Sequence, residues 1–163
     1  MSPPPYAVGL EWCEGLGYVP GPTRVFHNLY QGALACEPSR VAARRGEFDL
    51  VVLCAHDVEL PTMPSRVERI HLRLQDKPKL NLSERLQVQA AVRRILAVLH
   101  KDRKVLVACA MGLNRSSLVV GKTLRHLGAT PSQAVALIQR ARGPFALRVG
   151  GGPYFQELIA EEG

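Results

Sequence analysis

The sequence predicts a single α/β domain in which helices cover both faces of a central, mostly parallel sheet. Two observations support this fold class. The apolar stretches at 49–54 and 105–109 are nearly continuous, which is typical of central strands that are covered on both faces. Helical patterns fill most intervals between the strands, and such alternation favours a parallel sheet. A chain of 163 residues is long enough to bury one core, so we expect one domain.

Each predicted element has a local signal. Alternating or continuous apolar residues predict strands at 25–30, 49–54, 69–74 and 105–109. Capping signals and helical periodicity predict helices at about 82–100, 116–127, 131–142 and from 153 onward. Asn81 and Glu84 form a capping-box pattern, as do Thr130 and Gln133. Gly128 supplies the left-handed residue that commonly ends a helix.

Composition limits the classes of function. Residues 1–24 are rich in proline and glycine, and we expect an irregular lead-in before a folded domain at 25–163. No apolar run approaches the roughly 20 residues of a membrane span, and the start Met1-Ser-Pro-Pro-Pro5 does not resemble a secretion signal. We therefore expect a cytoplasmic protein without a membrane partner. The four cysteines show neither disulfide nor metal-ligand spacing. The net charge of +7 favours anionic partners in general.

The segment from Val105 to Ser117 carries the clearest chemical signal. A buried strand stops at Cys109, a six-residue turn containing Gly112 follows, and a helix is expected to begin close to Arg115. Successive backbone N–H groups in such a turn, together with the positive end of the helix dipole, can bind an oxyanion. The side chain of Arg115 can add a bidentate contact to phosphate, and the positive field favours the thiolate form of Cys109.

This spacing is specific to one cysteine. Arginine lies six residues after Cys109, whereas the other three cysteines are followed at that distance by Val19, Ala42 and Leu60. The phosphate-binding residues predicted from the loop are Ala110, Met111, Gly112, Leu113, Asn114 and Arg115.

On these residues the chain resembles the dual-specificity branch of the protein tyrosine phosphatase superfamily, whose signature is Cys-x-x-Gly-x-x-Arg-Ser/Thr. The likeness extends over roughly 25–160: Asn28-Leu-Tyr-Gln-Gly32 is similar to an early Leu-Tyr-x-Gly strand of the family, and Gly152-Pro-Tyr-Phe155 to its late Pro-Gly-Phe helix start. The resemblance implies a tyrosine-phosphatase-like fold that needs no metal and no cofactor. One departure is that the residue before the nucleophile, usually histidine in the family, is Ala108.

The resemblance also implies the catalytic residues. Cys109 is the expected nucleophile, and Arg115 the expected phosphate ligand. Ser116 is expected to donate a hydrogen bond to the sulfur. Thiol attack on a phosphate monoester also requires a proton for the leaving oxygen. Asp76, in the loop after the strand at 69–74, matches the general-acid aspartate of the family, and Asp57, in the loop after the strand at 49–54, is the competing choice.

The leading hypothesis is a protein phosphatase that acts on phosphotyrosine, and on phosphoserine or phosphothreonine as well, through a cysteinyl-phosphate intermediate. An RNA 5′-phosphatase or triphosphatase is the alternative, because related RNA enzymes carry Gly-Phe-Asn-Arg-Thr where this chain has Gly112-Leu-Asn-Arg-Ser116. A third hypothesis is a phosphate-binding module with weak catalysis, which Ala108 favours. The sequence leaves the natural substrate open among these classes.

Overall fold

The computed structural model describes residues 17–161, and in this part the chain folds around one mixed sheet. Five strands form it in the order β1-β2-β5-β3-β4. The β1–β2 pair is antiparallel and the other three pairs are parallel. The strands are β1 (Thr23–Phe26), β2 (Leu29–Ala33), β3 (Leu50–Leu53), β4 (Glu68–His71) and β5 (Val105–Cys109). The mostly parallel sheet confirms the predicted fold class.

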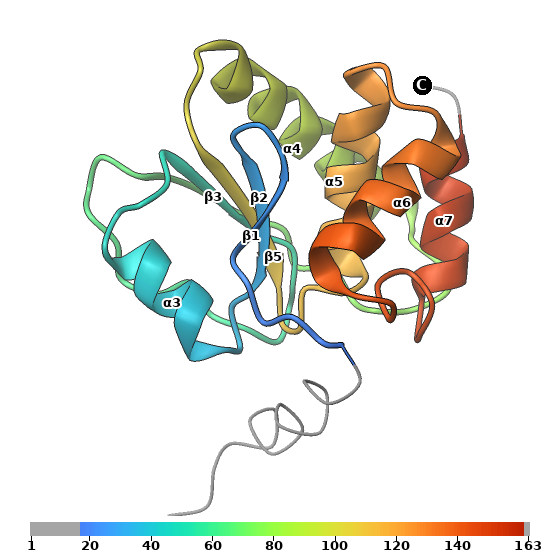
Figure 1. Ribbon diagram of the computed structural model, residues 1–163, viewed down its shortest axis with the longest axis horizontal. Helices are drawn as coiled ribbons and strands as arrows, with labels where there is room; N and C mark the ends of the chain where they lie inside the picture. The colour runs from blue at the N-terminus through green and yellow to red at the C-terminus, as the bar shows by residue number, and fades with distance from the viewer. Residues whose placement is uncertain (1–16, 162–163) are drawn as a thin grey trace, which may run out of the picture.

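Five helices of the described chain flank this sheet (Figure 1). One helix, α3, lies on one side of the sheet, and the other four lie together on the opposite side. The helices are α3 (Glu37–Arg44), α4 (Leu82–His100), α5 (Arg115–His126), α6 (Pro131–Arg142) and α7 (Gly152–Ala160). Both predicted capping boxes are present, at Asn81 with Glu84 and at Thr130 with Gln133. Within residues 17–161, no helix has the length and apolar character to cross a membrane.

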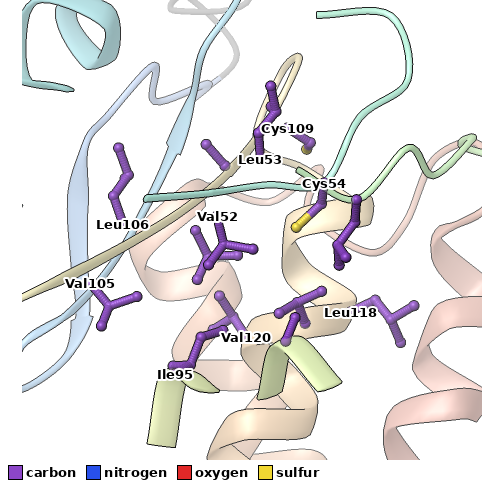
Figure 2. Packing of buried hydrophobic residues seen from close by; sticks show 14 of the residues in the cluster. Val52, Leu53, Cys54, Ile95, Val105, Leu106, Cys109, Leu118 and Val120 are labelled. Atoms are coloured by element: carbon purple, nitrogen blue, oxygen red, sulfur yellow. The ribbon is translucent and has the colours of Figure 1, made fainter. Parts of the chain in front are cut away.

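The core is built around the two strands that the sequence predicts to be central. Every residue of β3 and β5 is buried, and their apolar side chains extend to both faces of the sheet. Figure 2 shows Val52, Ile95 and Val120 gathered between the sheet and helices α4 and α5. Cys54, directly after β3, is fully buried, and burial raises the pKa of its thiol.

Two local features differ from the sequence prediction. The single strand predicted at 25–30 is a hairpin, because the chain reverses at His27, which has φ +49°, and Phe26 pairs with Leu29. The turn residues lack the glycine that is typical of a tight hairpin, so the sequence of 25–30 predicts one continuous strand. Helix α3 was also not predicted. It has only eight residues, and its buried side is formed by small residues, Ser39, Ala42 and Ala43, so no large apolar side chain marks that face in the sequence.

The parallel strands determine where the chemistry lies. β2, β3, β4 and β5 all end at the same edge of the sheet, and β5 lies between β2 and β3. The loop after Cys109 therefore meets the loops that follow β3 and β4 at this edge, where open α/β sheets bind their ligands.

Candidate active site

The loop predicted to bind phosphate connects the central strand to a helix. β5 ends at Cys109, which is 2% exposed, and α5 begins at Arg115. Between them, Gly112 has φ +69°, and a Cβ at this residue would lie 2.8 Å from the carbonyl oxygen of Gly32. The loop can therefore approach β2 this closely only because glycine occupies the position.

Every carbonyl from residue 109 to residue 113 accepts a hydrogen bond from the surrounding protein. The donors are Leu34 N to Cys109 O (2.9 Å), Ala35 N to Ala110 O (3.1 Å), Tyr18 Oη to Met111 O (2.7 Å), Arg142 Nε to Gly112 O (3.0 Å) and Leu147 N to Leu113 O (3.1 Å). In a trans peptide the N–H group points opposite to the carbonyl. The amides of residues 110–114 therefore turn away from these partners, and within residues 17–161 they have no acceptor. Such a row of N–H donors suits an oxyanion.

Among residues 17–161, the nucleophile candidate has one polar side chain at hydrogen-bond distance. The Sγ atom of Cys109 lies 3.2 Å from the Oγ atom of Ser116, which is fully buried in the first turn of α5. The predicted contact between these two side chains is therefore present. A hydroxyl that donates to sulfur stabilises the thiolate and, later, a departing thiolate.

Arg115 is held by the loops that follow β3 and β4. Its Nη1 atom donates to Asp57 Oδ1 at 2.7 Å and to the carbonyl oxygen of Leu74 at 3.2 Å. Both bonds use the same nitrogen, so Nε and Nη2 are left for two phosphate oxygens. Burial acts to lower the pKa of Arg115, but Cys109 and the two nearby aspartates outweigh it and the net shift is upward. The guanidinium stays charged.

The pairing with Arg115 decides the chemistry of Asp57. Partial burial acts to raise the pKa of this carboxyl, the Arg115 guanidinium lowers it more, and the net shift is downward. A carboxyl held in the charged form by an arginine is a poor proton donor at neutral pH. Asp57 is thus better suited to orienting Arg115 than to acting as the general acid.

Asp76 has a different set of partners. Its carboxylate accepts hydrogen bonds from Asn114 Nδ2, at 3.0 and 3.3 Å, and from the backbone N–H of Gly151 at 2.9 Å. Asn114 also donates to Val149 O and accepts from Leu147 N, so one buried amide joins the phosphate loop, the Asp76 loop and the segment before α7. The structure therefore brings Asp76 to the end of the phosphate loop, with neutral donors as its hydrogen-bond partners.

Three residues beneath the loop were not identified from the sequence. Arg142, in the last turn of α6, is fully buried and donates to Gly112 O and Met111 O. Tyr18 donates to Met111 O, and burial raises its pKa, so the phenol stays protonated. Gln31 of β2 is fully buried and donates to the hydroxyl groups of Ser116 and Ser117 in the first turn of α5. A glutamine within an apolar strand is a sequence signal that could have indicated a buried polar residue at Gln31. Nothing in the sequence distinguishes Arg142 from a surface arginine.

In the described chain, 17–161, no group of three or more histidine, cysteine, aspartate or glutamate side chains is arranged to hold a metal ion.

No protein-family model matches the sequence, and no curated protein matches it. Solved structures do. The chain is similar to human DUSP28 (TM-score 0.69, 22% identity, 87% of this chain and 95% of that one). It is also similar to a mouse putative dual specificity phosphatase complexed with zinc tungstate (TM-score 0.69, 23% identity, 86% and 88%). A third similar structure is OH1 from the Orf virus, described as a tyrosine phosphatase with triple substrate specificity (TM-score 0.63, 20% identity, 94% and 95%).

These likenesses extend over nearly the whole of each compared chain and agree in their fold. They match the architecture described above, a mostly parallel sheet flanked by helices. The chain has the fold of the cysteine-dependent dual-specificity and tyrosine phosphatases.

Proposed function

We propose that this protein hydrolyses phosphate monoesters on phosphoproteins through a cysteinyl-phosphate intermediate. The observation that carries the proposal is the outward bonding of the loop carbonyls at 109–113, which leaves the amides at 110–114 facing the side where a phosphate would lie. Arg115 and the start of α5 add positive charge to the same loop. The solved structures with this fold include proteins described as tyrosine and dual specificity phosphatases.

The first chemical step is attack of the Cys109 thiolate on phosphorus. The S–P bond forms, the bond between phosphorus and the leaving oxygen breaks, and Asp76 donates a proton to that oxygen. The loop amides and Arg115 bind the equatorial oxygens, where they stabilise the charge of the transition state.

The second step is attack of water on the phosphocysteine. Asp76, now a carboxylate, accepts a proton from the water, the O–P bond forms and the S–P bond breaks. The electron pair returns to the sulfur of Cys109, and the Ser116 hydroxyl at 3.2 Å stabilises the thiolate. Inorganic phosphate is released and the enzyme is restored.

A turnover comparison tests the proposal. The purified chain is assayed on a phosphotyrosine peptide, a phosphothreonine peptide and RNA with a 5′-triphosphate end, with Cys109→Ser as the matched control. We expect turnover of the phosphotyrosine peptide and its loss in Cys109→Ser, which exchanges one sulfur for oxygen and keeps the fold. In a second assay the phosphotyrosine peptide carries a 32P label and the reaction is stopped rapidly with acid. Labelled protein should be trapped with the wild type alone.

Three results would contradict the proposal. Near wild-type turnover in Cys109→Ser would exclude the thiolate mechanism. Turnover confined to the RNA substrate would favour the RNA-end reaction over phosphoprotein hydrolysis. Phosphate binding without turnover of any substrate would favour a binding module.

A further inference from the structure

Gln31 connects the second strand to the nucleophile through hydroxyl groups. This residue belongs to β2, which runs parallel to β5, and its side chain is fully buried beneath the phosphate loop. Its Nε2 atom donates to Ser116 Oγ at 2.9 Å and to Ser117 Oγ at 2.8 Å, with a longer contact to Gly112 O at 3.4 Å. Both N–H groups of the amide are therefore directed at the first turn of α5 and the loop.

The direction of these hydrogen bonds follows from the chemistry of the amide. An amide nitrogen only donates, so each hydroxyl accepts one hydrogen from Gln31. Ser117 passes its own hydrogen to the carbonyl oxygen of Leu113 at 2.7 Å. Ser116 Oγ has Cys109 Sγ as its remaining partner, at 3.2 Å. When Cys109 is a thiolate, which can only accept, the hydrogen of the Ser116 hydroxyl points at the sulfur.

The other end of the Gln31 amide supports a role for its donors. Oε1 is buried and has no hydrogen-bond partner within the described residues. Buried polar atoms without a partner are rare in folded proteins because they lose hydration for no return. An apolar side chain of the same length would avoid this unpaired oxygen, so what glutamine adds here is its pair of N–H groups.

The strand that carries the nucleophile cannot supply such a donor itself. The residue before Cys109 is Ala108, which is fully buried and lies opposite Gly32 in the register of β2 and β5. Neither residue has a polar side chain. Gln31, the neighbour of Gly32, fills this role from the adjacent strand.

We propose that Gln31 is a positioning residue that holds the Ser116 hydroxyl hydrogen on the sulfur of Cys109, which stabilises the thiolate. The proposal deepens the phosphatase function and rests on Cys109 being its nucleophile. Gln31 does not contact the substrate. It acts by fixing which way the Ser116 hydroxyl points.

The test measures the sulfur directly. Gln31→Met keeps the length of the side chain and removes both donors, while Gln31→Glu replaces the amide with an acceptor. The rate of Cys109 alkylation by iodoacetamide is followed against pH, with mass spectrometry of the Cys109 peptide. In Gln31→Met the midpoint should move up by about one pH unit, the tenfold change expected for losing one hydrogen bond to a charged group. Gln31→Glu should move it further.

The other charged and titratable groups around Cys109 are the same in the wild type and in all the variants. The groups whose charges couple to Cys109 are Arg115, Arg142, Tyr18 and Cys54, and every variant retains them. Ser117→Ala is the matched control, because it removes the other hydroxyl that Gln31 contacts and leaves the one beside the sulfur. It should produce a much smaller shift than Gln31→Met.

A double-mutant cycle separates this positioning role from a structural one. In the Ser116→Ala background, Gln31→Met should no longer move the midpoint, because the link to the sulfur is already absent. The same shift in both backgrounds would overturn the proposal, as would an unchanged midpoint in Gln31→Met. Ser116→Ala alone keeps Gln31 and must raise the midpoint at least as much, so the idea is testable even if the Gln31 variants do not fold. Alkylation needs no substrate, so its outcome is independent of whether the protein hydrolyses phosphoproteins.

Discussion

Two loops at one edge of the sheet each carry an aspartate, and the structure gives them different partners. Asp57, after β3, pairs with the guanidinium of Arg115 at 2.7 Å. Asp76, after β4, accepts hydrogen bonds from neutral groups, the side chain of Asn114 and the amide of Gly151. Both residues are loop aspartates in sequence, and only their neighbours distinguish them.

The difference concerns where a proton can reside. A carboxylate paired with arginine loses a favourable charge interaction when it is protonated, so the pKa of Asp57 is lowered and its charged form is favoured. A general acid must carry a proton before it can donate one. Pairing with Arg115 makes Asp57 the poorer proton donor and suits it to orienting the guanidinium, which leaves Asp76 as the proposed general acid. The predictions below test this division, beginning with the largest expected effect.

Asp76→Asn should slow hydrolysis of a phosphotyrosine peptide by about 10²–10⁴-fold, the usual contribution of a positioned acid. Asparagine retains an oxygen for the Asn114 and Gly151 donors, so the fold should survive. An aryl phosphate with a low-pKa phenol needs no proton on its leaving group and should be slowed much less. The measurement is the ratio of kcat values on the two substrates.

Asp57→Asn is the matched control for that ratio. It removes a carboxylate from the neighbouring loop and should slow both substrates equally. If the leaving-group dependence follows Asp57 instead of Asp76, the acid assignment is wrong while the nucleophile stands. If neither variant shows it, the proton comes from water or the substrate, which would favour anhydride substrates such as RNA triphosphates.

Arg115→Lys tests the partner of Asp57. Lysine keeps the charge, and so an ion pair with Asp57, but loses the planar fork for two phosphate oxygens. We expect kcat to fall by about 10²–10³-fold, the usual loss when an oxyanion donor is removed. Nearly full activity in Arg115→Lys, measured on the phosphotyrosine peptide, would show that positive charge alone is sufficient and that the bidentate contact is unnecessary.

Asp57→Asn should reduce kcat/KM by tenfold or less, because it removes one charge-assisted hydrogen bond worth about 1 kcal/mol and leaves Arg115 bonded to Leu74 O. The loss should be the same for the peptide and the activated aryl phosphate. A loss as large as that of Asp76→Asn would mean that Asp57 does more than orient the arginine.

The same variant has a signature in stability against pH. The pKa of Asp57 is lowered in the folded chain, so the pairing stabilises the fold above the ordinary aspartate range and this stabilisation disappears as pH falls through the lowered value. Asp57→Asn should therefore lose less free energy of unfolding than the wild type between about pH 5 and pH 2. Urea unfolding at several pH values measures this. Parallel curves would show that the pair adds nothing to stability.

The fold was accessible from the sequence wherever the signal was local. The continuous apolar runs that became β3 and β5 predict buried central strands, and the capping boxes at Asn81 and Thr130 predict helix starts that the structure confirms. The hairpin around His27 was missed because a non-glycine residue adopts the positive φ. Its strands are held together by hydrogen bonds between the strands, and a local sequence pattern does not predict such bonds.

The candidate site divides in the same way. Cys109, Gly112 and Arg115 lie within one strand-turn-helix unit. Seven successive residues contain all three, so the sequence alone is enough to locate the loop. Arg142 has no sequence signal that separates it from a surface arginine, yet it is fully buried beneath the loop. Nothing near it in the sequence indicates this, because its acceptors lie about thirty residues away on the phosphate loop.

The sequence by itself determined the class of sheet, the strand-turn-helix unit and the residue types of the loop, because each depends on neighbours within a few positions. Tertiary structure alone decided which aspartate meets Arg115 and which side chains donate to the loop carbonyls. Those choices depend on parallel strands ending at one edge, which brings together β2, β3, β4 and β5 from distant parts of the chain. A hydrogen bond forms only within about 3 Å, and the pairing of the strands determines which groups come that close.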